Sequence, residues 1–324
     1  MTLKLIKYIP FSLLFNHKFS SSICSYSERE IYLMKFIDEN GIVFISEAAP
    51  LPSFSDETTV EVINSLSQLM NNIIKLEPML FDLPPSIRYG IEQAFLYKSI
   101  SIGKPLVDFN LPKKVHVNSL FSLNEKIEGK LGATTKIKIG NDFTNELELI
   151  KKIPQETKIR LDVNGAWDLE TAKKNLDILS SIENIQYIED PCRTLNENIK
   201  LGGEKLIKIA IDNDCRNNAD IKKLEVINEI DFLILKPALS GSLFELADIL
   251  TKSKKNIIIT SAFESCISRH SLILLATLLK HDYAHGLSTG KYFSNDICEE
   301  LYPILNGEIK IDSLEYPKDL LIEV

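Results

Sequence analysis

Short β-branched runs alternate with amphipathic helical stretches from about residue 113 onward, and this alternation limits what the chain can fold into. Strands separated by helices predict a parallel sheet, because parallel neighbours need a crossover connection. Eight strands at this spacing predict a closed α/β barrel. A doubly wound sheet is the alternative, but no G-x-G-x-x-G or P-loop motif follows a predicted strand. The predicted strands are Val115–Asn118, Lys136–Ile139, Ile159–Val163, Ile185–Ile188, Lys208–Ile211, Phe232–Leu235, Asn256–Thr260 and Tyr283–Leu287, and the predicted helices include Glu146–Ile153, Leu169–Leu179, Leu243–Lys252 and Leu272–Leu279.

Residues 1–112 lack this repeat and are predicted to form a separate α+β domain, with the barrel at 113–302. The last segment, 303–324, contains the strand-like run GEIKIDS and is expected to pack back onto the first domain. The elements predicted for the first domain are a hairpin of Tyr32–Phe36 and Ile42–Ile45 around the turn Asp38–Gly41, a helix Thr58–Ile74 capped by Asp56, and a helix Ile87–Tyr97.

Charge and hydropathy exclude some classes of partner. The net charge of −8 and the lack of a basic patch argue against nucleic acid. No apolar run approaches the roughly 18 residues that a membrane span needs. At the N-terminus, Lys7, Pro10 and Asn16 interrupt the apolar stretch, which favours an opening strand over a signal peptide.

The cysteines are five in number and scattered, with no C-x-x-C pair. An odd, dispersed set favours reduced thiols and a cytoplasmic location over a disulfide framework. Nothing in the sequence predicts the oligomeric state. The five are Cys24, Cys192, Cys215, Cys266 and Cys298.

Charged or small polar residues fall near the end of successive predicted strands, at steps of 23 to 27 residues, which is one strand–helix unit each time. The carboxyl ends of barrel strands surround one cavity, so these side chains are expected to meet there. For any single aspartate, a helix N-cap is the alternative role. The series is Lys138, Asp162, Glu189, Asp212, Lys236, Ser261 and Ser288.

The three acids of this series, Asp162, Glu189 and Asp212, fall on successive strands and would repel one another without a cation. Mg²⁺ prefers carboxylate oxygens and keeps further positions for water or substrate oxygens. The histidines are dispersed, which disfavours zinc. The sequence therefore predicts a Mg²⁺ site, with Mn²⁺ as a substitute.

Lys138 and Lys236 fall on strands to either side of these acids, which favours proton removal from a carbon next to a carboxylate. Lys136 shares a strand face with Lys138 by period two, so its charge is expected to lower the pKa of Lys138. An exposed strand edge is the alternative placement for this pair. A Schiff base is the alternative lysine chemistry, and a carboxylate- or metal-binding barrel without turnover is the alternative class.

Several smaller signals predict contacts with a small-molecule carboxylate substrate. Gly241 and Ser242 lie near a predicted helix start, where free N–H groups could hold a carboxylate. Ser261 and Ser288 lie at the last two strand ends, and turn chemistry is their alternative role. Arg160 and Asn164 are expected on the same strand face as Asp162, because side chains two residues apart point the same way. They are candidate substrate contacts or part of an interior layer of the barrel.

With these residues in place, the chain resembles the enolase superfamily, in its muconate-lactonising-enzyme branch. Within that branch it is most similar to the o-succinylbenzoate synthase family of menaquinone biosynthesis. The matching stretches cover nearly the whole chain. They are KIKIG (136–140), RLDVNGAW (160–167), YIEDPC (187–192), IAIDND (209–214), LILKPALSGS (233–242), TSAFES (260–265), GLSTG (286–290), EAAPLPSFS (47–55) and PPSIRYGIEQAFL (84–96).

The resemblance implies an α+β capping domain, completed by 303–324, and a modified TIM barrel of the (β/α)7β type. It implies Lys138 as the acid/base residue, Lys136 as the modulator of its pKa, and Lys236 as a cation stabilising the enediolate. The three acids would ligate Mg²⁺. The implied reaction is the syn dehydration of 2-succinyl-6-hydroxy-2,4-cyclohexadiene-1-carboxylate to o-succinylbenzoate and water.

An N-acylamino-acid racemase or dipeptide epimerase of the same superfamily is the nearest alternative, because it would use the same two lysines. Dipeptide epimerases typically carry D-x-D at the eighth strand, and GLSTG lacks it. The chain also departs from the synthase pattern, with Asn213-Asp214 where the family usually has Glu-Ser. No pattern assigns substrate contacts to the first-domain loop, residues 15–28.

Overall fold

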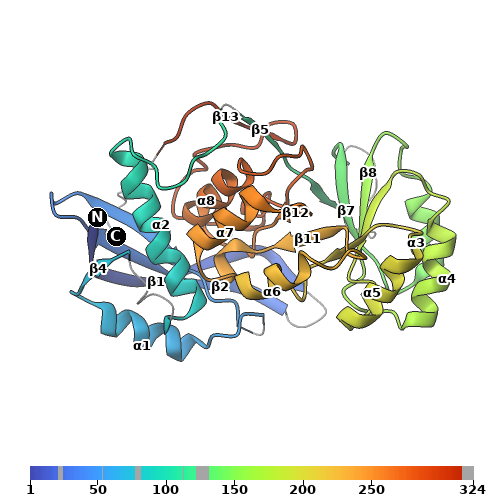
Figure 1. The fold of residues 1–324 in the computed structure, drawn as a ribbon, viewed down its shortest axis with the longest axis horizontal. Coiled ribbons are helices and arrows are strands. Elements are labelled where there is room, and N and C mark those ends of the chain that lie inside the picture. The colour runs from blue at the N-terminus through green and yellow to red at the C-terminus, as the bar shows by residue number, and fades with distance from the viewer. Residues whose placement is uncertain (21–24, 53, 77–81, 112, 122–130, 316–324) are drawn as a thin grey trace.

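The computed structural model describes residues 1–20, 25–52, 54–76, 82–111, 113–121 and 131–315. Figure 1 shows the N-terminal sheet with helices α1 and α2 toward one end of the molecule, and helices α3, α4 and α5 at the other end. No helix within these ranges combines the length and apolarity that a membrane crossing requires.

The N-terminal part is an antiparallel sheet with two helices. Its elements are β1 (Thr2–Ser20), β2 (Ser25–Ile37), β3 (Val43–Ala48), α1 (Thr59–Leu69), β4 (Ile73–Lys75) and α2 (Pro85–Ser101). The strand order is β3-β2-β1-β4. The predicted hairpin is confirmed, since β2 pairs with β3. At its turn the Asp38 N–H donates to the Ile42 carbonyl at 2.9 Å, and Gly41 takes a φ of +81° that favours glycine.

Helix α1 is shorter than predicted, and its cap is a different residue. Thr58, rather than Asp56, caps it: the Thr58 hydroxyl accepts from the Glu61 N–H at 3.2 Å, and the Glu61 carboxylate accepts from the Thr58 N–H at 2.8 Å. This reciprocal pair satisfies two otherwise unpaired donors at the helix start. The helix ends at Leu69, because Asn71 adopts a left-handed φ of +63° and leads the chain into β4.

The second part is the predicted parallel barrel. Seven parallel strands pair in the order β12-β11-β10-β9-β8-β7-β6. The strands are β6 (Ser119–Phe121), β7 (Thr134–Lys138), β8 (Lys158–Asp162), β9 (Ile185–Glu189), β10 (Ile209–Ile211), β11 (Phe232–Leu235) and β12 (Asn256–Ile259), and the helices are α3 (Phe143–Ile150), α4 (Leu169–Leu179), α5 (Leu195–Glu204), α6 (Asn218–Leu224), α7 (Leu243–Lys252) and α8 (Cys266–Ala276), with short 3₁₀ turns η2 (Pro237–Leu239) and η3 (Gly290–Tyr292).

The eighth predicted strand, Tyr283–Leu287, closes the barrel through isolated bridges. His285 bridges to Val117 at one edge of the sheet, and Gly286 bridges to Thr260 at the other. The Gly286 N–H donates to the Ile259 carbonyl at 2.9 Å. Eight chain segments therefore surround the barrel axis.

The predicted first barrel strand, Val115–Asn118, is confirmed only in its second half, where Val117 and Asn118 pair with His285 of the eighth segment. Residues Lys113–His116 form β5, which pairs antiparallel with β13 (Glu308–Ile311), and β6 is the first barrel strand. Strand β13 therefore pairs with β5, and the expected packing of segment 303–324 onto the first domain stays a prediction. Residues 316–324 lie outside the described residues, and the predicted domain boundaries stay a prediction.

Helix α2 joins the two parts. The Cβ that an alanine would place at Gly90 would lie 2.4 Å from the Glu47 carbonyl, so the helix approaches β3 as only glycine permits. On the other side, the Glu92 carboxylate accepts from the Ser242 hydroxyl at 2.8 Å and from the Phe244 N–H at 3.0 Å. The N-terminal part, which we call the cap from here on, is thereby bonded to the start of α7.

Two of the five cysteines form a disulfide, Cys266–Cys298. The prediction of reduced thiols is wrong for this pair, because the fold brings together residues separated by 32 positions that share no sequence motif. Cys192 and Cys215 are buried free thiols, and Cys24 lies outside the described residues. The cytoplasmic location inferred from reduced thiols stays a prediction.

Candidate active site

Five neighbouring strands bring five charged residues to one end of the barrel. All five line one cavity. Strands β7 and β11 are four positions apart among eight segments, so they lie on opposite sides of the barrel. Lysines therefore face the cavity from opposite walls, and the acids lie on the strands between. In strand order the residues are Lys138 at the end of β7, Asp162 at the end of β8, Glu189 at the end of β9, Asp212 directly after β10 and Lys236 directly after β11.

Lys136 points to the same side as Lys138, as the strand period predicts, and bonds to two of the acids. Its Nζ donates to Glu189 Oε1 at 2.8 Å and lies 2.9 Å from Asp162 Oδ2. Burial lowers the pKa of Lys136, but the carboxylates of Asp162 and Glu189 outweigh burial and raise that pKa well above its ordinary value. Lys136 is therefore a cation. Its effect on the pKa of Lys138 stays a prediction.

The acids fit a hard divalent cation by their chemistry. Burial raises the pKa of Glu189; Lys136 opposes that rise, and Asp162 and Asp212 add to it. Glu189 Oε2 is buried and has no hydrogen-bond partner among the described residues, which is an acceptor that a cation would satisfy. With the side chains as they stand, no three His, Cys, Asp or Glu residues of the described ranges form a ready-made metal site. Lys136 instead bridges two of the acids.

Lys236 on the opposite wall is held from two sides. Its ammonium group bonds to Asp212, and the ring of Phe54 lies over it with the centroid 4.3 Å from Nζ. Phe54 comes from the loop between β3 and α1. The N-terminal part therefore contributes directly to the environment of this lysine.

The loop after β8 places Asn164 at the cavity as predicted. Asn164 and Gly165 both have left-handed φ values, +52° and +69°, which turn the chain back across the strand end. The Asn164 side-chain amide donates to Asp162 Oδ1 at 2.8 Å. Asn164 thus orients an acid as well as lining the cavity.

Ser261 and Ser288 also line the cavity, on its last two walls. The Ser261 hydroxyl donates to the buried carboxylate of Glu264 and accepts from the Thr289 hydroxyl at 2.7 Å. It also accepts from the Phe263 N–H at 3.0 Å, so its one hydrogen and both of its acceptor positions are already used within the protein. The Ser288 hydroxyl lies 3.4 Å from the Asn118 carbonyl.

Three predicted substrate contacts lie away from the cavity lining. Arg160 is buried inside the barrel, where its guanidinium donates to Asn118 Oδ1 at 3.1 Å and lies over the ring of Tyr187. Ser242 caps α7 and donates to Glu92, and Gly241 precedes it. The structure thus gives Arg160 and Ser242 interior contacts. For Arg160 they match the interior barrel layer considered as its alternative role, and the predicted contacts of both residues with substrate are untested.

Sequence reasoning missed the cavity residues that come from the N-terminal part. Tyr26, Leu51 and Phe54 line the cavity, and Tyr26 falls within the 15–28 segment that had no assignable pattern. A further missed residue is Asp190, which follows Glu189 in a left-handed conformation with φ of +41°. Its buried carboxylate accepts from the Asn213 N–H at 2.9 Å and so holds the loop that carries Asp212. The motif YIEDPC contained the only signal for it.

Comparison with known proteins gives curated relatives at low identity. An o-succinylbenzoate synthase of Thermobifida fusca is 25% identical over 208 residues, covering 61% of this chain and 65% of that protein. An o-succinylbenzoate synthase of Mycobacterium leprae is 28% identical over 176 residues, covering 53% of each chain. The chain therefore spans about half to two thirds of the length of the curated relatives it matches.

Solved structures match over nearly the whole chain. An o-succinylbenzoate synthase from Thermosynechococcus elongatus, with Mg in its active site, has a TM-score of 0.75 at 21% identity and covers 95% of this chain and 97% of its own. A dipeptide epimerase from Methylococcus capsulatus, with Mg and a dipeptide, has a TM-score of 0.81 at 16% identity, covering 97% and 98%. At these identities the likeness establishes the fold alone.

A family model described as enolase C-terminal domain-like matches residues 124–314. This range is more than half of the chain and contains the six charged residues that line the cavity, Lys136 included. The chain belongs to the enolase C-terminal domain-like family of the enolase superfamily.

Proposed function

We propose that this chain is a Mg²⁺-dependent o-succinylbenzoate synthase, a carbon–oxygen lyase of menaquinone biosynthesis. It would dehydrate 2-succinyl-6-hydroxy-2,4-cyclohexadiene-1-carboxylate to o-succinylbenzoate. The observation that carries the proposal is the order of charges around the barrel mouth: lysines on opposite walls, with three acids on the strands between. The curated relatives of that activity support it.

Lys138 is the proposed acid/base residue. Its amine in neutral form removes the proton from the carbon that bears the substrate carboxylate. The resulting ammonium then returns that proton to the hydroxyl that leaves from the same face, which balances a syn elimination of water. Lys136, held as a cation two residues earlier, supplies the neighbouring positive charge expected to favour the neutral form of Lys138.

Lys236 is proposed to stabilise the negative charge that develops on the substrate, from the side opposite Lys138. Its bond to Asp212 and the ring of Phe54 above it fix the ammonium group before substrate arrives. A fixed charge needs no reorganisation during the reaction, which is where such groups contribute most.

The residues that would hold Mg²⁺, or Mn²⁺ in its place, are Asp162, Glu189 and Asp212. When bound, the ion would supply positive charge to the substrate carboxylate. Asn164 would keep Asp162 oriented through its bond to Oδ1, and Asp190 would hold the backbone around Asp212.

The cavity walls suit a ring-containing carboxylate. Apolar side chains from both parts of the chain line the cavity beside its charged end. An apolar wall with a few polar groups binds a six-membered carbon ring and orients its carboxylate. The apolar residues include Leu51, Phe54, Leu120, Ile234 and Ile258.

Racemisation of N-acylamino acids or epimerisation of dipeptides is the second candidate, because lysines on opposite walls also suit proton transfer to and from one α-carbon. The cavity wall around Gly286–Gly290 provides Ser288 and Thr289 but no acid to bind a free amino group. This favours the dehydration over the dipeptide reaction.

The test is an ultraviolet assay of the purified protein with the cyclohexadiene substrate, with Mg²⁺ and with a chelator. We expect turnover with Mg²⁺ that the chelator abolishes. Lys138→Ala should lower kcat/KM at least about 10²–10⁴-fold, the usual contribution of a general acid/base. Lys151→Ala is the control, since Lys151 is an exposed lysine paired with Glu148.

Two results would count against the proposal. Lys138→Ala with turnover near that of the unaltered protein would remove Lys138 from its role. Exchange of the α-proton of a dipeptide or N-acylamino acid in D₂O, with no dehydration of the cyclohexadiene, would favour the second candidate.

A further inference from the structure

The disulfide encloses one wall of the active-site cavity. Cys266 is the first residue of α8, and Cys298 lies 32 positions later. The loop that this bond closes contains the eighth barrel segment and η3. It therefore carries several cavity-lining residues: Gly286, Ser288, Thr289 and Tyr292.

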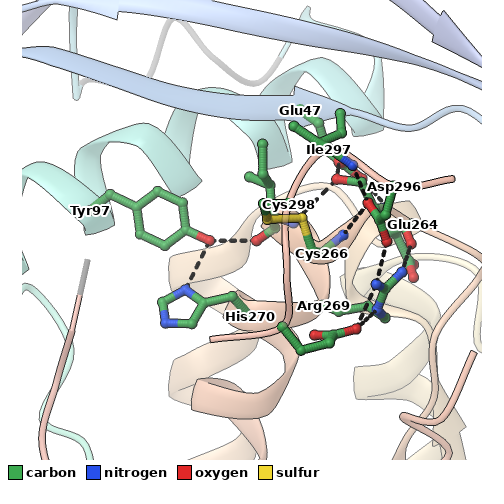
Figure 2. Close-up of a disulfide and its surroundings, with 12 residues drawn as sticks. Glu47, Tyr97, Glu264, Cys266, Arg269, His270, Asp296, Ile297 and Cys298 are labelled. Carbon is green, nitrogen blue, oxygen red and sulfur yellow. Dashed lines mark hydrogen bonds and ion pairs between the residues drawn. A yellow bond between two sulfur atoms is a disulfide. The ribbon is translucent and has the colours of Figure 1, made fainter. Parts of the chain in front are cut away.

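The residues after η3 are bonded to α8 on one side and to strand β1 on the other. Figure 2 shows the contacts with α8. Asp296 accepts from the Cys266 N–H at 3.0 Å and pairs with the buried guanidinium of Arg269 at 2.5 Å. Glu300 pairs with the same guanidinium at 2.5 Å. The end of the cavity wall is thus held to α8 by one covalent bond and by an ion-pair cluster.

On its other side the same segment binds strand β1 of the cap. The Ser294 N–H donates to the Leu14 carbonyl at 2.8 Å, and the Leu14 N–H donates to Asn295 Oδ1 at 2.7 Å. The ring of Phe293 lies 4.8 Å from that of Phe15. Residues 290–298, which we call the wall segment, therefore connect the barrel mouth to the cap.

The two cysteines differ in exposure. Cys266 is buried at 3% exposure, whereas Cys298 is partly exposed and lines a second, open cavity with Lys291, Glu299 and Pro303. Cys298 is therefore the more accessible of the two cysteines to an attacking thiolate. The departing sulfur would be that of Cys266, at the N-terminus of an 11-residue helix, where negative charge is stabilised.

We propose that Cys266–Cys298 is a redox-modification site whose reduction by a dithiol protein or small dithiol loosens the wall segment. One thiolate of the dithiol attacks the Cys298 sulfur and displaces the Cys266 thiolate. The second thiol of the reductant then attacks the mixed disulfide. The cystine gains two electrons and two protons, and the dithiol becomes a disulfide.

Reduction leaves the non-covalent anchors in place, so the expected effect is local. Arg269 still pairs with Asp296 and Glu300, and Leu14 still bonds to Asn295. The lost constraint is the closure of the loop that contains the cavity wall, which limits the locally opened and the unfolded states more than the folded one. The wall segment should open more often while the barrel stays folded.

The test is hydrogen–deuterium exchange of the full chain, oxidised and after treatment with dithiothreitol. All proteins in this experiment carry Cys24→Ser as their background, because Cys24 lies outside the described residues. Before the exchange measurement, mass spectrometry of peptides maps the Cys266–Cys298 disulfide. We expect amides of residues 289–298 to exchange at least about tenfold faster after reduction, and peptides covering β8 and β9 to stay unchanged. The melting temperature should fall by roughly 5–10 °C.

Two variants separate this proposal from a general effect of the reductant. Cys298→Ser should show the fast exchange of 289–298 without any reductant, and should gain nothing more from it. Cys215→Ser removes a buried free thiol elsewhere and should behave as the background does.

Because exchange is read on the backbone, the result does not depend on which reaction the enzyme performs. Failure of dithiothreitol to reduce the folded protein overturns the proposal, as does equal exchange in both redox states.

Discussion

The Lys236 ammonium group lies 4.3 Å from the ring centroid of Phe54, a residue of the loop between β3 and α1. On its other side this ammonium bonds to Asp212. One charge at the barrel mouth is therefore shared between a barrel acid and an aromatic ring of the cap. The cap completes the environment of the lysine rather than only covering the cavity.

Replacing that ring should weaken transition-state stabilisation in the proposed dehydration. A cation–π contact contributes roughly 0.5–2 kcal/mol, which corresponds to about a two- to thirtyfold loss of kcat/KM for Phe54→Leu. Phe54→Tyr keeps a ring and should stay within about twofold of the unaltered protein. Steady-state kinetics of both variants is the measurement. Equal losses in the leucine and tyrosine variants would mean that the shape of the loop, and not the ring, supports Lys236.

The charged residues of the cavity could be predicted from sequence because they follow the strand repeat. One residue per strand–helix unit placed Lys138, Asp162, Glu189, Asp212 and Lys236 at one barrel end, and the structure brings them to one cavity. That inference needs only strand count and direction, and both are encoded locally in the spacing of apolar runs.

What could not be predicted depends on contacts between distant segments. Phe54 reaches Lys236 from a loop with no periodicity, and Cys266 meets Cys298 with no sequence motif. Ser242 was expected to contact substrate because it precedes a helix, which stays a prediction; the sequence did not show that its hydroxyl donates to Glu92 of α2. Sequence spacing near Ser242 contains no information about the helix that packs against it.

Metal binding should depend on Asp212 and not on its neighbour Asp214. Asp212 lines the cavity beside Asp162 and Glu189, whereas Asp214 does not line it. We expect Asp212→Asn to weaken Mn²⁺ binding at least about tenfold, since it removes one of the three proposed charged oxygen ligands. Asp214→Asn should leave it unchanged. Electron paramagnetic resonance of free Mn²⁺ measures this without any turnover, and equal affinity in the two variants would place the ion elsewhere.

Two adjacent glycines of α5 should respond oppositely to alanine. A Cβ at Gly202 would lie 2.0 Å from the Glu229 carbonyl, whereas at Gly203 the nearest atom is the Glu229 side chain at 4.0 Å. Gly202→Ala should therefore cost about 1–3 kcal/mol of unfolding free energy. Gly203→Ala should gain up to about 1 kcal/mol from helix propensity. Urea unfolding of both variants checks this pair, and a stabilised Gly202→Ala would show that α5 does not pack closely on Glu229.

Glu47 should make the folded protein less stable as the pH rises toward 8. Burial is the main cause that raises the pKa of Glu47 to about 7; its bond from Ser265 opposes the rise, and the nearby carboxylates of Glu264 and Asp296 add to it. An unfolded glutamate has a pKa of about 4.3. Between these values the folded chain keeps a proton that the unfolded chain has released, so the contribution is complete below pH 4 and is lost as the pH rises through 7.

Glu47→Gln isolates this contribution, because glutamine keeps an acceptor for the Ser265 hydroxyl and does not titrate. The unfolding free energy of the unaltered protein minus that of the variant should fall by up to about 3 kcal/mol between pH 5 and pH 8. Urea unfolding at four pH values in this range is the measurement. Titrating groups that do not interact with Glu47, including His270, cancel in the difference because both proteins contain them. The exposed Glu61→Gln serves as the control and should give a difference that does not fall as the pH rises from 5 to 8. A flat difference for Glu47 as well would mean that its carboxylate is ionised in the fold, with a charged partner close enough to offset its burial.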